Sequence, residues 1–160
     1  MVLPLLPFLA SLLIGSADQA AALPKGPAVT QHAAGTFDVK ITPQKDEGVG
    51  HATIGRMGID KQYHGDLVGT GLGQMLAGMG EVKDSGAYVA IERVTGTVHG
   101  RTGSFAVHHL GVMDRGAQRL VITVIPDSGT GDFAGITGTM TIEIKGGAHY
   151  YTLDYTLPAH

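Results

Sequence analysis

The sequence predicts an all-β protein folded as one antiparallel barrel, and three observations support this class. Runs rich in Val, Ile, Phe and Tyr alternate with short glycine-bearing breaks, a pattern typical of a β-meander. These breaks are too short for the crossover connections that parallel strands need. Finally, 25 glycines and a charged fraction of 16% in 160 residues, without a long segment of helical spacing, argue against a helical bundle.

The centre of the predicted fold is residues 86–131, in which we expect strands at 88–98, 104–113 and 120–125. The glycine-rich residues 65–80 suit sharply coiled strands, because glycine tolerates bends and close backbone approach. The count is about eight strands, and a closed barrel of that size has an interior filled by side chains or holding one small ligand. Further strands, in which apolar and polar side chains alternate, are expected at 36–42, 54–64, 136–145 and 149–157.

Residues 1–22 are expected to be a signal peptide, because an uncharged apolar run is followed by small residues suited to cleavage. The alternative is an apolar arm that packs on the barrel or on a neighbouring subunit. Residues 23–34 are expected to be a linker, and residues 35–158 a single barrel domain. The expected location is therefore secreted or periplasmic, or cytoplasmic if the arm alternative holds. The apolar run is short for a membrane span, so we expect no membrane contact of the mature form.

Composition excludes several classes of function. The net charge is −3 and Lys and Arg do not cluster, so nucleic acid is not an expected partner. The chain has no cysteine, which excludes disulfides and thiolate chemistry. Residues 120–125 are apolar on both faces of their expected strand. Something must cover the outer face, and this predicts a homo-oligomer.

Several short motifs occur together in an order known from one bacterial family. They are Gly55-Arg56-Met57, His64-Gly65-Asp66-Leu67, residues 88–96, Gly100-Arg101 and residues 126–131. Over about residues 35–158 the chain resembles the domain-of-unknown-function 3224 family. The resemblance implies an eight-stranded antiparallel barrel similar to that of allene oxide cyclase, and it implies no assigned reaction. The pair His108-His109 departs from the Gln-His pair common in that family, and residues 1–22 are an addition.

Glu92 is the leading candidate for chemistry, because it lies in the middle of an otherwise apolar strand with Tyr88 on its own face. In an apolar lumen, desolvation would raise the pKa of its carboxyl and suit it to general acid or base catalysis. The alternative is an ion pair with an Arg or Lys of a neighbouring strand. His109 shares a face with the apolar Phe105 and Val107. Two roles are open for it: a core histidine whose hydrogen bonds are satisfied, or a proton carrier into the cavity.

These considerations give a set of candidate residues. The candidate catalytic residues are Glu92, His109 and Tyr88. No metal or other cofactor is expected, because adjacent strand residues such as His108 and His109 point to opposite faces and cannot reach one ion. For Tyr151 and Tyr155, which share a face of the last expected strand, the alternative to ligand binding is a role in the core. The candidate ligand-binding residues are Arg56, His64, Arg93, Phe105, Tyr151 and Tyr155.

The tetrad Asp127-Ser128-Gly129-Thr130 has the local pattern of an aspartic protease, which needs two such carboxylates to share a proton. One copy is present, so we favour a turn in which Asp and Ser cap backbone amides and Gly supplies a positive φ.

Taken in order, these features predict a barrel whose lumen binds an apolar or partly polar small molecule. Three functions stay open: a cofactor-free cyclase or isomerase, a non-catalytic carrier, and an oligomeric barrel packed solid by side chains.

Overall fold

The computed structural model describes residues 29–45 and 54–159. Within these residues the chain forms strands joined by turns and loops, and no helix. The strands are β1 (Gln31–Pro43), β2 (Ile54–Gly65), β3 (Leu67–Met79), β4 (Gly86–Val98), β5 (Arg101–Asp114), β6 (Ala117–Val124), β7 (Thr130–Gly131), β8 (Thr137–Lys145) and β9 (Ala148–Thr156).

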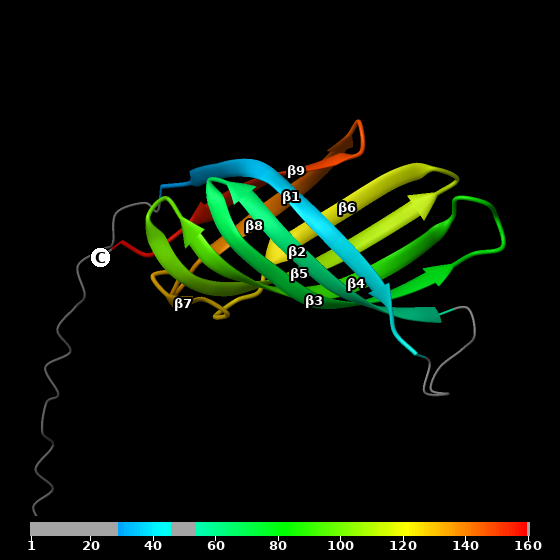
Figure 1. Cartoon of the computed structure of the whole chain (residues 1–160), viewed down its shortest axis with the longest axis horizontal. Helices are drawn as coiled ribbons and strands as arrows, with labels where there is room; N and C mark the ends of the chain where they lie inside the picture. The colour runs from blue at the N-terminus through cyan, green and yellow to red at the C-terminus, as the bar shows by residue number, and fades with distance from the viewer. Residues whose placement is uncertain (1–28, 46–53, 160) are drawn as a thin grey trace, which may run out of the picture.

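The eight long strands form a closed antiparallel barrel, which confirms the predicted fold class (Figure 1). Around the barrel they follow the order β4, β3, β2, β1, β9, β8, β6 and β5, and pairing of β4 with β5 closes the ring. Most neighbours are also consecutive in sequence, as expected for a meander. The two-residue β7 pairs with β5 through Thr130 and Gly131, where the long connection from β6 to β8 passes.

The observed strands differ from the predicted ones mainly at their ends. β1 begins at Gln31 rather than Thr36, because its first residues pair with β9 from Gln31 opposite Tyr155 to Phe37 opposite His149. The last four residues of the expected linker therefore belong to the barrel. The glycine-rich segment is one continuous strand, β3. The expected signal peptide at residues 1–22 lies outside the described residues.

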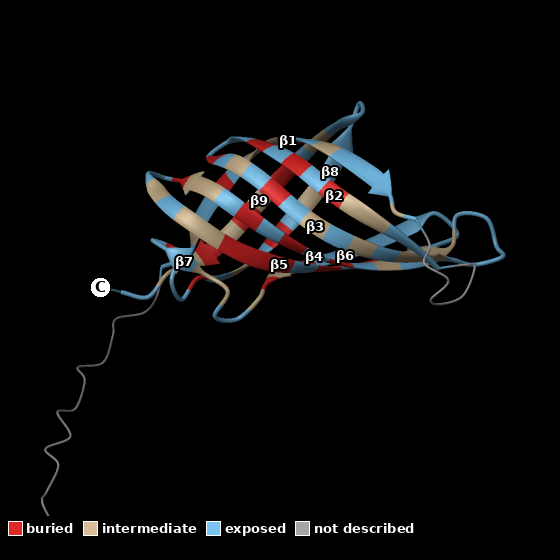
Figure 2. Cartoon of the chain, turned by 60° about the horizontal axis from the view of Figure 1, so that its bottom comes forward, coloured by how far each residue is buried: buried red, intermediate tan, exposed pale blue. Residues whose placement is uncertain are grey.

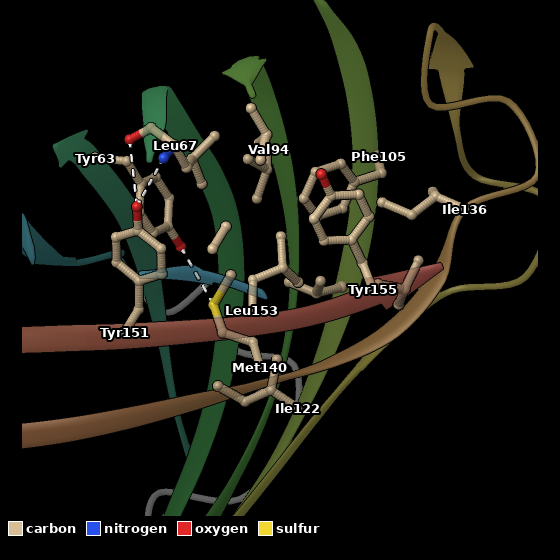
Figure 3. Close-up of a cluster of buried hydrophobic side chains, with 14 of the residues drawn as sticks. Tyr63, Leu67, Val94, Phe105, Ile122, Ile136, Met140, Tyr151, Leu153 and Tyr155 are labelled. Carbon is tan, nitrogen blue, oxygen red and sulfur yellow. Dashed lines mark hydrogen bonds between the residues drawn. The ribbon is translucent and has the colours of Figure 1, made fainter. Parts of the chain in front are cut away.

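The two ends of the barrel differ in how well they are packed. Large side chains that are almost completely buried gather at the end where β7 lies, among them Tyr63, Leu67, Phe105 and Tyr155 (Figures 2 and 3). At the opposite end, aliphatic side chains on the inner faces of their strands stay exposed: Ile41 at 42%, Met79 at 58%, Leu120 at 37% and Ile144 at 62%. The barrel is thus closed by a packed core at one end and has an apolar mouth at the other.

The structure also fixes the orientation of the central strands, which the sequence left open. On β4, Glu92 is buried with Ala90 and Val94, while Ile91 and Arg93 are exposed. On β5, His109 is buried while His108 is exposed. Glu92 and His109 therefore both face the interior.

Candidate functional site

A cluster of polar side chains lies inside the barrel around Glu92. Lys61 Nζ donates a hydrogen bond of 2.7 Å to Glu92 Oε2, and the Tyr63 hydroxyl donates one of 2.7 Å to Glu92 Oε1. His109 Nε2 lies 3.1 Å from Glu92 Oε2 and has no other polar partner among the described residues. Each of the four residues is at most 4% exposed.

The register of β2, β3 and β4 brings the cluster together. Lys61 and Tyr63 lie two residues apart on β2 and therefore point to the same face. β3 separates β2 from β4, and Gly71 of β3 pairs with Lys61. A Cβ at Gly71 would overlap Glu92 Oε1, so the carboxylate occupies the space that a side chain at position 71 would need. Glycine at this position lets residues of two non-adjacent strands meet.

The contacts of Glu92 decide its charge. Burial raises the pKa of its carboxyl, but His109, Lys61 and Tyr63 lower it more, and the pKa falls from 4.5 to about 2. Burial and the Glu92 carboxylate together raise the pKa of Tyr63, so its phenol stays protonated. The shift of Glu92 is opposite to the one expected for a general acid or base. The cluster therefore matches the other alternative, a buried ion pair, with Lys61 as the partner.

Tyr88 lies on the same face of β4 as Glu92, nearer the open end of the barrel. Its ring packs on the backbone of Gly111, where a Cβ would overlap ring atoms. Burial raises the pKa of the Tyr88 phenol, and the Glu92 carboxylate adds to this shift. Its hydroxyl forms no hydrogen bond with any residue in the described part of the chain.

A pocket of about 400 Å³ opens at the apolar mouth. Tyr88 forms part of its wall, and the other inward-facing side chains that line it come from β3, β5 and β6: Met75, Ala77, Met79, Met113, Gln118 and Leu120. Its size is within the range of small-molecule sites. The pocket lies on the mouth side of Tyr88, and the ion pair of Glu92 and Lys61 lies further inside.

The remaining candidate residues lie elsewhere. Arg56, His64 and Arg93 are on the outer face, where His64 Nε2 lies 3.1 Å from Asp38 Oδ2 and Arg93 donates to Ser104 Oγ at 3.0 Å. The other three belong to the buried cluster drawn in Figure 3. Phe105 packs against Phe133, Tyr151 lies edge-on to Tyr63, and Tyr155 lies beside His99. Tyr151 therefore reaches the Glu92 cluster through the Tyr63 ring, whereas Arg56, His64 and Arg93 lie on the outside of the barrel.

Sequence reasoning missed Lys61 and Tyr63 as site residues. The signal was present, because Lys61 shares one face of its strand with the apolar Met57, Ile59 and Tyr63. A lysine on a buried face needs an anionic partner. Among the described residues no group of three side chains is arranged to hold a metal ion.

The tetrad at residues 127–130 leads from a turn at residues 126–127 into β7, so Asp127 is in a turn and Thr130 pairs with β5. Ser128 Oγ accepts a hydrogen bond from the Ala106 amide at 3.0 Å. The positive φ values occur at Asp127 and Gly131 rather than at Gly129. Gly129 is required for a different reason, since a Cβ there would overlap the Phe133 carbonyl oxygen.

The described residues contain no helix long and apolar enough to cross a membrane. The homo-oligomer expected from the sequence stays a prediction.

Fold and site together define a small antiparallel barrel with an ion pair enclosed in its core and an apolar mouth. Residues 33–155 match the model of a family described as protein of unknown function (DUF3224), and the chain belongs to this family. A crystal structure at 1.84 Å resolution of a DUF3224 protein of unknown function from Shewanella oneidensis MR-1 is similar, with 41% sequence identity and a TM-score of 0.74. The match covers 81% of this chain and 100% of that one. No curated protein matches the chain.

Proposed function

We propose that the protein is a binding protein for a small, largely apolar molecule, which it holds in the mouth pocket. The observation that carries this proposal is that Met79 and Leu120, on the inner faces of their strands, remain exposed around a pocket of about 400 Å³. Leaving aliphatic side chains in water is unfavourable, by roughly 25 cal/mol for each Å². An apolar ligand that covers them gains this free energy.

The polar groups fit a site that binds rather than reacts. Tyr88 lines the pocket, and the Glu92 carboxylate helps to raise the pKa of its phenol. Its hydroxyl has no hydrogen-bond partner among the described residues, so it is available to a polar group of the ligand. Glu92 is committed to Lys61 and Tyr63 and is a weak base at neutral pH, because its pKa is about 2. A general base works best when its pKa is near the working pH.

A cofactor-free cyclase or isomerase is the second candidate, and the Tyr88 hydroxyl is the observation that favours it. A protonated phenol beside an apolar pocket can donate a hydrogen bond to a substrate oxygen while the pocket holds one conformer. In that case Tyr88→Phe lowers turnover more than it lowers substrate affinity. In a binding protein the same change affects affinity alone.

The pocket is tested with N-phenylnaphthylamine, a neutral apolar probe whose fluorescence rises when it leaves water. Ala77→Phe fills the pocket from β3, whereas Val68→Phe places the same ring on the exposed outer face of the same strand, away from the pocket. We expect Ala77→Phe to weaken probe binding by about tenfold or more, a loss of about 1.4 kcal/mol, and Val68→Phe to leave it unchanged. Equal binding by both variants would contradict the proposal.

The natural ligand is sought by native mass spectrometry of protein purified from its own host, before and after denaturation. A mass excess that disappears on denaturation, and that is absent from Ala77→Phe, identifies the ligand class. The intact mass also gives the number of subunits and shows whether residues 1–22 are retained.

A further inference from the structure

The mouth pocket is lined by methionine more than by any other residue type. Three of the six methionines of the chain, Met75, Met79 and Met113, are among its lining residues. Met75 and Met79 lie on the inner face of β3, two residues to either side of Ala77. Met113 lies on the inner face of β5 and pairs with Gly86, which also pairs with Met79. Thioether groups therefore face the pocket from two of its strands.

The side chains of the pocket wall leave a space open over Ala77. Tyr88 is the partner of Ala77 in the register of β3 and β4, but its ring leans the other way and covers Gly111 of β5. Met79 leans in the same direction, since a Cβ added at Gly86 would lie 2.8 Å from its sulfur. Ala77 carries only a methyl group, so its inner side is left uncovered beside the Tyr88 ring.

This space, the Ala77 slot, has the dimensions of one aromatic ring. It is bounded along β3 by Met75 and Met79 and on the β4 side by the Tyr88 ring. A strand rises about 3.3 Å for each residue, so the Cα atoms of Met75 and Met79 are about 13 Å apart. A methionine sulfur contacts an aromatic ring favourably at about 5 Å from it. The spacing therefore leaves room for one ring with a sulfur on each side.

The polar side chains that face the pocket are uncharged. Tyr88 and Gln118 are the polar members of its inward-facing lining, whereas Arg119 alternates with the inward-facing Leu120 and points outward. Burial raises the pKa of the Tyr88 phenol, which stays protonated at neutral pH. Its free hydroxyl can donate a hydrogen bond to an oxygen of the ligand. The pocket therefore fits a neutral molecule that carries a polar atom.

Methionine distinguishes an aromatic ligand from a saturated one. An aliphatic ligand gains apolar contact from a leucine side chain as it does from methionine, because this gain depends on the buried area. The sulfur adds a contact that only an aromatic ring receives. A ring in the Ala77 slot also meets the ring of Tyr88, and aromatic pairs are favourable beyond the area that they bury.

We propose, on the basis of the proposed function, that the ligand of the mouth pocket is a neutral aromatic molecule whose ring lies in the Ala77 slot between Met75 and Met79. An oxygen on this ligand accepts a hydrogen bond from the Tyr88 hydroxyl. The thioethers and the Tyr88 ring select an aromatic ring over a saturated one, and the hydroxyl fixes its orientation.

The selectivity is tested by isothermal titration calorimetry of the full chain with 2-naphthol and decahydro-2-naphthol. The two molecules share a carbon skeleton and a hydroxyl group, but the second has no aromatic ring. The saturated molecule has the larger apolar surface, so burial alone favours it. We expect the native chain to bind 2-naphthol more tightly, by about threefold or more. Equal binding, or tighter binding of the saturated molecule, would overturn the proposal.

The role of sulfur is tested with the double variant Met75→Leu with Met79→Leu, which removes two sulfurs and nearly conserves volume. We expect it to weaken 2-naphthol binding by about threefold or more and to leave decahydro-2-naphthol binding unchanged. Met57→Leu is the matched control, because Met57 lies on the inner face of β2 but does not line the pocket. If circular dichroism shows that the double variant does not fold, Met79→Leu serves alone, since Met79 is 58% exposed. An equal effect on both ligands would overturn the proposal.

The hydrogen bond is tested by comparing 2-naphthol with naphthalene. We expect Tyr88→Phe to weaken 2-naphthol binding by about threefold or more and to leave naphthalene binding unchanged. An equal effect on both would overturn the assignment of the ligand oxygen to Tyr88.

Ala77→Phe distinguishes failure of this inference from failure of the proposed function. If the native chain prefers decahydro-2-naphthol and Ala77→Phe abolishes its binding, the pocket binds a ligand but not an aromatic one, and only this inference is overturned. If Ala77→Phe binds both ligands as the native chain does, or if the native chain binds neither, the inference and the proposed function are both overturned.

Discussion

Lys61 and Glu92 form an ion pair of 2.7 Å inside the barrel, although β3 separates the two strands that carry them. The contact crosses β3 at Gly71, where no side chain blocks it. The ammonium also lies 4.7 Å from the centre of the Phe37 ring, which favours a cation further. Enclosed charges of this kind are costly when one partner is missing.

Glu92→Gln is therefore expected to destabilise the fold strongly. The substitution keeps the volume of the side chain but leaves the Lys61 ammonium without an anion in the interior. Breaking a buried pair in this way costs about 3–5 kcal/mol. The measurement is the free energy of unfolding from urea denaturation of the native chain and the variant.

The double variant Glu92→Gln with Lys61→Met is the control for this prediction. It removes the uncompensated cation, so we expect it to be more stable than Glu92→Gln alone. A double variant as unstable as the single one would show that the loss comes from packing rather than from charge.

Stability should also depend on Glu92 at acidic pH. The pKa of its carboxyl is lowered from 4.5 in the unfolded chain to about 2 in the folded one. A lowered pKa contributes stability above the unfolded value, and this contribution is lost as the pH falls toward the folded value. We expect a loss on the order of 3 kcal/mol between these two pH values.

The measurement for this prediction is the unfolding free energy at several pH values between 5 and 2. Glu92→Gln has no carboxyl at this position, so its stability should fall less steeply over the same interval. Parallel curves for both proteins would assign the acid sensitivity to other carboxylates.

The sequence predicted the barrel well because alternation of side chains depends on local residues alone. It placed Lys61 and Tyr63 on one face of β2 with Met57 and Ile59, and that face is buried. It did not pair Lys61 with Glu92, because their contact depends on the register of three strands. The expected partner was on a neighbouring strand, whereas Lys61 lies one strand further away.

The direction of the Glu92 pKa shift also depends on contacts between strands, which the sequence could not predict. The apolar residues around Glu92 correctly predicted that its side chain is buried, and burial by itself raises the pKa of the carboxyl. The opposing contacts come from two other strands, so the sequence could not weigh them. Arg56, His64 and Arg93 were expected to bind a ligand because they are polar, and they lie outside because β2 and β4 point their apolar faces inward.

Gly71→Ala tests whether the glycine of β3 is needed for the ion pair. The new methyl group would overlap Glu92 Oε1 and approach the Tyr63 ring. Both side chains are completely buried and hydrogen-bonded to each other, so neither can yield freely. Overpacking of this kind costs about 1–3 kcal/mol.

Gly55→Ala is the matched control on β2, because a Cβ there would meet only Met57 Cε, at an ordinary 3.7 Å. We expect the midpoint of thermal unfolding to fall clearly for Gly71→Ala and little for Gly55→Ala. Similar midpoints for both variants would show that Glu92 has room to move.

Tyr151→Phe separates a structural role of this tyrosine from the ligand-binding role first considered for it. The Tyr151 hydroxyl accepts a hydrogen bond from the Leu67 amide at 2.9 Å (Figure 3). It also donates one to the His64 carbonyl at 3.2 Å, and so holds the turn between β2 and β3. Removing it leaves the buried amide of Leu67 without this acceptor, at a cost of about 1–3 kcal/mol. The adjacent Tyr150 is exposed, and Tyr150→Phe should leave the unfolding free energy unchanged.

Because Tyr151 belongs to the packed end of the barrel and the pocket to the mouth, Tyr151→Phe should bind N-phenylnaphthylamine as the native chain does. A variant of native stability that fails to bind the probe would instead return Tyr151 to the binding site.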